Sequence, residues 1–443
     1  MKLVIIGGTA AGTSVAAKAR RNDPTLDIVL YEKSDTVSFG ACGLPYFIGG
    51  YFADTQRMVA RTVAQFQASG IAAHTHHEVL AVDSAQKTLR VKDHTRGLTF
   101  STAYDRLVIA SGSTPLLPPF QHRELENIFT LKTLQDGQQL KRLADDPAIR
   151  QVIIVGAGFI GLELADTLHG KDKAITVIQL DPHVLPEAFD PEISTHLEQE
   201  MRNKGIRLLL AESVRGFEGQ HRVEQVITDK GRYPADLVVI CTGVRPNTGF
   251  LADSGIALHN GAVMTDPYGE TNIPGIFAAG DCALVHDRVK NAPAYVPLAT
   301  VANKLGRIVG QNVSGERVAF PGTLASAAIK VLDIEAARTG LSEKEAAKQG
   351  IKYKTVVVKD KNPTDYLDAQ FDIHTKIIYE ADSKIILGAQ MAGRSGAVMR
   401  IGIFSVAIHA RLTTTELGFL DLAYAPPFAR TWDAVNTAAN AAR

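Results

Sequence analysis

The chain has 443 residues, with 47 basic and 47 acidic side chains and a formal net charge of zero. This length predicts two or three domains, and the balanced charge without a long basic run argues against nucleic acid or an anionic membrane as a partner. No segment has the apolar length needed to span a bilayer. Three cysteines are too few for a disulfide framework, which favours free thiols and a cytoplasmic location.

The first predicted strand, 3–6, runs into a glycine-rich turn at 7–12 that reads Gly-Gly-Thr-Ala-Ala-Gly. A helix is expected to about residue 21, and then a strand that ends at Glu32. The first glycine makes the tight turn, the last allows the helix to pack closely, and the helix N-terminus offers N–H groups to a pyrophosphate. Thr9 replaces the middle glycine. Glu32 lies about twenty residues on, where a carboxylate suits a ribose hydroxyl.

A single cysteine follows this unit. Cys42 lies in the segment Ser-Phe-Gly-Ala-Cys-Gly-Leu-Pro-Tyr at 38–46, and Phe47 stands where a dithiol enzyme often keeps its second cysteine. A thiol at this position is placed to meet a redox cofactor, and any redox cycle would use one protein sulfur. Pro45 indicates a helix start close to Cys42, whose dipole is expected to lower the pKa of the thiol.

Three histidines, His74, His76 and His77, invite a metal interpretation. No carboxylate or cysteine pattern completes a ligand set around them. They are interpreted as part of a surface strand, and no metal site is predicted.

A second glycine-rich turn, Gly-Ala-Gly-Phe-Ile-Gly at 156–161, follows a predicted strand at 152–155. A helix and a strand ending at Gln179 come next. Two such units in one chain imply two bound dinucleotides. A carboxylate at position 179 would bind a ribose 2′-hydroxyl and repel a 2′-phosphate. Gln179 does neither strongly, and no arginine lies in 180–183, so the choice between NADH and NADPH stays open.

Two apolar strands end in small residues, at 107–113 and 238–243, and small residues let the backbone pass close to a cofactor. Further on, Asp281 follows Gly280 after another short strand. By itself Asp281 would be interpreted as a helix N-cap. Because Asp281 follows two dinucleotide-binding units in the sequence, it is expected to bind the ribityl hydroxyls of a flavin.

These motifs together resemble the single-cysteine branch of the pyridine nucleotide–disulfide oxidoreductases, which includes coenzyme A disulfide reductase, NADH oxidase and NADH peroxidase. The resemblance implies an α/β chain with two Rossmann-like dinucleotide-binding domains and a C-terminal α+β dimerisation domain. The FAD-binding domain would comprise residues 1–117 and 246–325, and the domain that binds NADH or NADPH would comprise 118–245. The dimerisation domain would comprise 326–443. It also implies a homodimer whose active sites are shared between the subunits.

Details within the branch point in two directions. The oxidases and peroxidases carry a histidine where this chain has Ala10. The segments 42–46 and 422–427 resemble coenzyme A disulfide reductase, whose tyrosine in the second segment, here Tyr424, reaches the partner's active site. Tyr366 stands where that reductase has a second tyrosine, but its surroundings are closer to those of the oxidases.

The resemblance therefore implies an FAD-dependent NAD(P)H oxidoreductase that reduces coenzyme A disulfide or a related small disulfide or persulfide. Cys42 would alternate between a thiolate and a mixed disulfide or sulfenic acid. Tyr424 and Tyr366 would protonate the leaving thiolate. An NADH oxidase or peroxidase, which reduces oxygen or peroxide, is the alternative. A flavoprotein redox sensor that signals through dimer contacts is a more distant one.

The candidate residues follow from these motifs. The expected cofactor-binding residues are Gly7, Gly8, Thr9, Ala11, Gly12, Glu32, Lys33, Ala110, Ser111, Gly112, Gly280, Asp281 and Ala299 for FAD, and Gly156, Gly158, Phe159, Ile160, Gly161, Gln179 and Gly243 for NAD(P). The expected substrate-binding residues are Ser14, Lys18, Arg21, Ser38, Phe39 and Asn303. The first three share one helix face, which would meet coenzyme A phosphates or simply be solvated.

Overall fold

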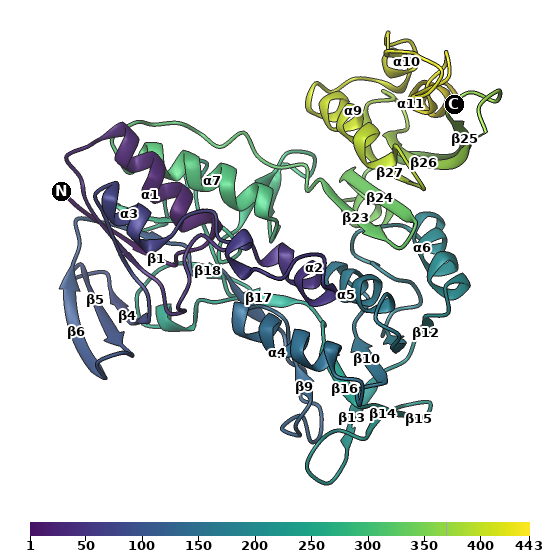
Figure 1. The fold of residues 1–443 in the computed structure, drawn as a ribbon. Helices are drawn as coiled ribbons and strands as arrows, with labels where there is room; N and C mark the ends of the chain where they lie inside the picture. Colours follow the sequence, from purple (N-terminus) through teal and green to yellow (C-terminus); the bar gives the residue numbers. More distant parts are fainter. Residues whose placement is uncertain (369) are drawn as a thin grey trace.

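Three five-stranded sheets dominate the computed structural model, which describes residues 1–368 and 370–443 (Figure 1). The first sheet is parallel, in the order β20-β7-β1-β2-β3. Its last strand in sequence comes from a distant part of the chain, so two separate segments build it. The strands are β1 (Lys2–Ile6), β2 (Asp27–Tyr31), β3 (Ile71–His74), β7 (Arg106–Ile109) and β20 (Ile276–Ala278).

Alternate residues of β1 face opposite sides of this sheet. Leu3 and Ile5 pack against α1 (Ala10–Asn22), α3 (Val63–Ala68) and α7 (Ala299–Asn312). Val4 and Ile6 pack against an antiparallel sheet made of β4 (His77–Asp83), β5 (Thr88–Asp93) and β6 (Leu98–Ala103). Both faces are therefore buried, as the continuous apolar sequence of β1 requires.

The second sheet repeats this plan, in the order β12-β11-β10-β16-β9. One face packs on three helices and the other on an antiparallel sheet. The strands are β9 (Ile128–Phe129), β10 (Gln151–Val155), β11 (Ala174–Ile178), β12 (Arg207–Leu209) and β16 (Leu237–Ile240). The covering elements are α4 (Leu134–Asp145), α5 (Phe159–His169), α6 (Pro191–Asn203), β13 (Val214–Glu218), β14 (Gln225–Thr228) and β15 (Arg232–Pro234).

Short elements link the two sheets. The chain enters the second sheet after β8 (Ser113–Pro115) and leaves it through β17 (Val244–Pro246), and these two strands pair antiparallel. The remaining short elements are α2 (Leu44–Gly49), β18 (Leu258–His259), β19 (Ala262–Val263), β21 (Val285–Asp287) and β22 (Ala292–Ala294), with 3₁₀ turns at Ala41–Gly43, Thr55–Met58 and Gly249–Leu251.

The third sheet is antiparallel, in the order β23-β24-β27-β26-β25, and lies with its helices at the far end of the molecule from α1 (green to yellow in Figure 1). Its strands are β23 (Ala327–Val331), β24 (Ile334–Gly340), β25 (Tyr353–Asn362), β26 (Phe371–Glu380) and β27 (Ile386–Gly393). Its helices are α8 (Glu343–Lys348), α9 (Ala397–His409), α10 (Thr414–Gly418) and α11 (Ala434–Asn440).

A buried ion cluster ties this third unit to the second. The Lys376 Nζ atom in β26 lies 2.6 Å from Glu343, 2.9 Å from Glu192 and 3.3 Å from Asp190, and the lysine side chain is fully buried. Asp190 and Glu192 belong to the start of α6. A fully buried ammonium group is tolerated here because three carboxylates surround it.

The expected fold class is confirmed: two Rossmann-like α/β units precede an α+β unit. Within residues 1–368 and 370–443, every helix is too short or too polar to traverse a bilayer.

Candidate active site

The first glycine loop has a backbone that only glycine can adopt. Gly7 has φ +103°, and a Cβ atom there would lie 2.1 Å from the Ala110 carbonyl oxygen. A Cβ atom on Gly12 would lie 1.9 Å from the Gly7 oxygen. The loop therefore passes directly over the end of β7 and brings the start of α1 to the carboxyl edge of the sheet. Helix N-terminal N–H groups at such an edge suit a pyrophosphate.

Glu32, at the end of β2, closes one side of this loop. Its Oε2 atom accepts the Gly8 N–H at 2.7 Å, and its Oε1 atom accepts the Ser34 N–H at 2.8 Å. Two backbone donors thus hold a buried carboxylate beside the glycine loop, at the position expected for a ribose-binding acid.

Three polar side chains, Lys132, Ser113 and Asp281, form a hydrogen-bonded series near the glycine loop. Ser113 Oγ donates to Asp281 Oδ2 at 2.9 Å, and Lys132 Nζ donates to Ser113 Oγ at 3.0 Å while lying 3.7 Å from Asp281. Gly280, just before Asp281, has φ +86° and approaches α1, because a Cβ atom there would lie 2.9 Å from Ala11 Cβ. Ser113 is the last residue of the small-residue segment at 107–113, whereas no motif in the sequence marks Lys132.

Tyr295 adds a buried hydroxyl group that has no hydrogen-bond partner among the residues that the structure describes. Burial raises the pKa of Tyr295, and Asp281 and Cys282 add to the rise. A glycine cradle, a held carboxylate, the Asp281 chain and this unpaired hydroxyl fit the phosphates and hydroxyls of a flavin dinucleotide.

The other predicted FAD residues lie around the same edge. Thr9 is the N-cap residue of α1, Ala299 is the first residue of α7, and Lys33 is exposed beyond β2. The Ser111 Oγ atom donates to the Asn247 carbonyl oxygen at 2.7 Å. Gly112, beside it, has φ +67°.

The second glycine loop repeats the first. Gly156 has φ +106°, and a Cβ atom there would lie 2.4 Å from the Cys241 oxygen; a Cβ atom on Gly161 would lie 2.1 Å from the Gly156 oxygen. The Ala157 N–H donates to Gln179 Oε1 at 2.8 Å. Gly158 is the N-cap residue of α5, which begins with the predicted residues Phe159 and Ile160, and Gly243, beyond β16, has φ +109°.

Cys42 lies between these two units. Its 3₁₀ turn is anchored because the Ser38 N–H donates to the Gly8 oxygen at 2.7 Å and the Gly40 N–H donates to the Met58 oxygen at 2.9 Å. The following helix, α2, packs closely on α5, since a Cβ atom on Gly49 would lie 2.7 Å from Thr167 Cβ. Cys42 is a free, exposed cysteine.

The electrostatic surroundings of Cys42 overturn one expectation. Partial burial of the thiol raises its pKa, and the carboxylates of Glu163 and Asp281 raise it further. The positive charge of Lys132 acts in the opposite direction. The predicted lowering of the pKa by a helix dipole is therefore wrong. Helix α2 has only six residues, and burial of the thiol, together with two nearby carboxylates, outweighs it.

Glu163 is a site residue that the sequence analysis missed. It lies half-buried in α5, and burial raises the pKa of its carboxyl to about 7, with a further contribution from Asp166. The signal that could have found it is its place two residues after Gly161, the last glycine of the second turn.

The two predicted tyrosines meet each other and not the cysteine of their own chain. The hydroxyl oxygens of Tyr366 and Tyr424 are 3.3 Å apart, and both side chains are exposed. They lie in the third unit, on the segments that follow β25 and α10, and Figure 1 shows these two elements at a distance from α2. Other large apolar side chains exposed in this unit are Val357, Met399, Val406, Phe419, Leu420, Phe428 and Trp432.

The predicted substrate residues fall on two surfaces. Ser14 Oγ donates to Asn303 Oδ1 at 2.9 Å, where α1 packs on α7, and Lys18 Nζ donates to Asn22 Oδ1 at 2.6 Å one turn further along α1. Arg21 is exposed at the end of that helix. Ser38 and Phe39 lie apart from this face in sequence, on the loop that leads to Cys42; Ser38 has φ +53°, and Phe39 forms a β-bridge with Val59.

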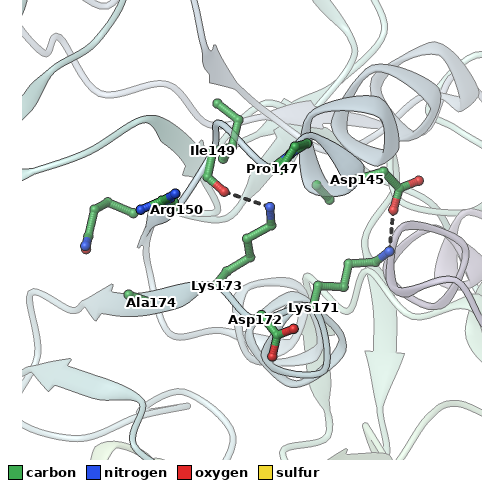
Figure 2. A pocket seen from close by; sticks show the side chains of 10 residues that line it. Asp145, Pro147, Ile149, Arg150, Lys171, Asp172, Lys173 and Ala174 are labelled. Carbon is green, nitrogen blue, oxygen red and sulfur yellow. Dashed lines mark hydrogen bonds and ion pairs between the residues drawn. The ribbon is translucent and has the colours of Figure 1, made fainter.

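A hollow of about 610 Å³ lies at the amino-terminal ends of β10 and β11, whereas the second glycine loop lies at the carboxyl end of β10 (Figure 2). Lys171 Nζ contacts Asp145 Oδ1 at 2.5 Å, and Lys173 Nζ donates at 2.7 Å to the carbonyl oxygens of Asp146 and Ile149. These cations are already engaged, and both glycine loops are elsewhere. The hollow does not belong to the candidate site.

The structure gives two of the three histidines a packing role, whereas His76 is exposed. His74 and His77 stack on Tyr31, with ring centroids 5.6 and 5.8 Å away. Within the described ranges, no group of three or more His, Cys, Asp or Glu side chains is arranged to hold a metal ion.

Comparison with known proteins identifies the family. The family model described as pyridine nucleotide-disulphide oxidoreductase matches residues 1–304, and the model of the dimerisation domain of that family matches residues 326–435. The chain is 34% identical over 433 residues to an NAD(P)H coenzyme A polysulfide/persulfide reductase from Pyrococcus horikoshii, covering 98% of this chain and 96% of that protein. It is 30% identical over 444 residues to an NADH oxidase from Enterococcus faecalis, covering 100% and 99%.

Two solved structures give the same family. An NAD-dependent persulfide reductase from A. fulgidus has a TM-score of 0.96 at 34% identity, covering all of this chain and 83% of that one. A water-forming NADH oxidase from Lactobacillus brevis, bound to NADH, has a TM-score of 0.96 at 31% identity, covering 100% and 98%. The chain therefore belongs to the pyridine nucleotide-disulphide oxidoreductase family and is an oxidoreductase that uses FAD and NAD(P)H.

Proposed function

We propose that the chain uses NAD(P)H to reduce coenzyme A disulfide or a related small disulfide, persulfide or polysulfide, with Cys42 as its redox-active sulfur. The observation that carries this proposal is the position of Cys42. It is an exposed thiol held between the two dinucleotide units, whereas Cys282 is buried and Cys241 is partly buried. A cytoplasmic location is part of the proposal, because all three thiols are free.

The proposed domain boundaries are those expected from the sequence. FAD takes 1–117 and 246–325, NAD(P)H takes 118–245, and 326–443 forms the dimer contact. The pairing of β8 with β17 supports the two crossings between the first and second units. The exposed aromatic side chains of the third unit support its role in dimerisation.

When bound, FAD supplies the two-electron link between NAD(P)H and a sulfur atom. The thiolate of Cys42 attacks one sulfur of the substrate disulfide, forming a mixed disulfide and releasing the other half as a thiol. NAD(P)H then supplies two electrons and one proton as a hydride, and the solvent supplies a second proton. Together they restore the Cys42 thiol and release the second half of the substrate as a thiol.

Proton transfer is required before attack, because the pKa of Cys42 is raised in this setting. Glu163 raises that pKa through its charge, and burial raises the pKa of its own carboxyl to about 7, so we assign to it the exchange of that proton. On release, the leaving thiolate needs a proton as well. The Tyr366–Tyr424 pair, acting beside Cys42 of the partner subunit, would donate it.

Substrate binding is assigned to two surfaces. Lys18 and Arg21 offer cationic groups to the phosphates of coenzyme A, with Ser14 and Asn303 beside them. Ser38 and Phe39, on the loop that precedes Cys42, would contact the substrate beside the thiol.

An NADH oxidase is the second candidate. The setting of Tyr366 favours it, and so do full-length relatives of that name at 29–30% identity. Ala10, which replaces the histidine of the oxidases, favours the reductase. Measuring NADH consumed per oxygen, with and without coenzyme A disulfide or persulfide, separates the two. Rapid NADH oxidation with oxygen alone, unchanged by either sulfur substrate, would replace the reductase proposal by the oxidase one.

A further inference from the structure

Gln179 occupies in the second unit the place that Glu32 occupies in the first. Glu32 accepts the Gly8 N–H at 2.7 Å, and Gln179 accepts the Ala157 N–H at 2.8 Å. Only the carbonyl oxygen of an amide side chain can accept from an N–H donor. The glycine loop thus fixes the orientation of the Gln179 amide, and its NH₂ group must point away from the loop.

That NH₂ group meets a carboxylate. Gln179 Nε2 donates to Asp181 Oδ2 at 2.8 Å. In the first unit, the second oxygen of Glu32 instead accepts the N–H of Ser34, again two residues on, at 2.8 Å. The negative charge found at the strand end in the first unit is therefore displaced by two residues in the second, onto Asp181.

The Asp181 carboxylate is held in place and remains accessible. Its backbone oxygen accepts the Ala211 N–H at 2.9 Å, its side chain accepts from Gln179, and the residue is only partly buried. A partly buried carboxylate with one fixed donor keeps capacity for a further hydrogen bond.

One lysine and one histidine border the same segment, and each faces a carboxylate of its own. Lys344 Nζ lies 2.6 Å from Glu187 Oε1, and His183 Nδ1 lies 3.1 Å from Glu198 Oε1. Neither is free to neutralise a phosphate placed beside Asp181.

We infer that Asp181, oriented by Gln179, makes the chain select NADH over NADPH. A carboxylate at this corner of a Rossmann unit accepts a hydrogen bond from the ribose 2′-hydroxyl and repels a 2′-phosphate. Gln179 is a positioning residue, because its carbonyl oxygen is engaged by the loop and it carries no charge. This inference concerns the electron donor and does not depend on which acceptor the enzyme reduces.

The test is calorimetric titration of the purified FAD-containing protein with ADP-ribose and with 2′-phospho-ADP-ribose, which differ only in the phosphate and cannot be oxidised by hydride transfer. The parent should bind ADP-ribose at least about ten-fold more tightly, as expected for one well-placed like-charge contact. Asp181→Asn keeps the shape and an acceptor for Gln179 but removes the charge. The preference should fall to about three-fold or less, mainly through tighter binding of the phosphorylated ligand.

Two further variants make the result decisive. Asp181→Glu keeps the charge and should keep the preference. Asp172→Asn makes the same change of charge in the hollow of Figure 2, at a φ of +52° that asparagine tolerates, and should leave both affinities unchanged. Equal affinities in the parent, or a preference that Asp181→Asn does not alter while FAD is retained, would overturn the inference. Failure with coenzyme A substrates would leave it standing.

Discussion

The hydroxyl oxygens of Tyr366 and Tyr424 lie 3.3 Å apart, although the residues are 58 positions apart in the chain. The contact raises the pKa of Tyr424, because Tyr366 hydrogen-bonds to its neutral form. Two exposed hydroxyl groups so placed form one proton-donating unit rather than two independent ones.

This pairing predicts a non-additive effect on disulfide reduction. Tyr424→Phe should slow the single-turnover reduction of coenzyme A disulfide only modestly, because Tyr366 remains. The Tyr366→Phe, Tyr424→Phe double variant should be slower by about 10²–10⁴-fold, the range for positioned acid–base groups. Reduction of the bound flavin by NAD(P)H should be unchanged. A double variant that reduces the disulfide at the parent rate would make these tyrosines structural.

Cys42→Ser should retain FAD and lose disulfide reduction. Serine keeps the size of the side chain but cannot form a disulfide with the substrate. Bleaching of the flavin absorbance by NAD(P)H should persist, because that step does not need the sulfur. Cys241→Ala is the control, because it removes a thiol that packs against the hydrophobic core of the second unit; it should retain turnover. Parent-like turnover in Cys42→Ser would disprove the role of this thiol.

Glu163→Gln should shift the reactivity of Cys42 to lower pH. Above about pH 7 the Glu163 carboxyl is ionised, and its charge raises the pKa of the Cys42 thiol. Removing that charge lowers the thiol pKa, so thiolate forms at lower pH. The measurement is the rate of alkylation of Cys42 by iodoacetamide between pH 6 and 10, compared with Glu124→Gln as an exposed control. Identical pH profiles for Glu163→Gln and the parent would show that the carboxyl does not act on the thiol.

Lys376→Met should destabilise the protein strongly. It would leave three carboxylates facing one another in the interface between α6 and the third sheet, and losing one partner of a buried ion pair costs about 3–5 kcal/mol. Lys344→Met removes an exposed amino group that pairs with Glu187 at the same interface, and should cost no more than about 1 kcal/mol. Urea unfolding of both variants provides the measurement. Equal losses would mean that the buried cluster adds nothing beyond a surface pair.

Much of the fold could be predicted because its signals are local. Gly7 and Gly156 adopt positive φ angles and leave no room for a Cβ atom, so the two turns require glycine wherever they occur. The apolar strands before them must be buried on both faces. The position of Cys42 after the first unit follows from the same chain order.

The electrostatics of the site depended on residues that only tertiary structure brings together. Lys132, Glu163, Asp281 and Tyr295 come from distant segments, and none belongs to a spacing pattern around Cys42. The pKa of Cys42 follows from burial and from the charges of Glu163, Asp281 and Lys132, whereas the local sequence shows only a proline and a helix start.

Sequence by itself determined the α/β class, the two dinucleotide units, the single redox cysteine and the family resemblance, because these rest on backbone constraints within short segments. Tertiary structure decided that the thiol pKa is raised, that Tyr366 meets Tyr424, and that the charge beside the second glycine loop lies on Asp181. The physical reason is that side-chain orientation and the distances between charges are set by packing between remote segments, which no local pattern encodes.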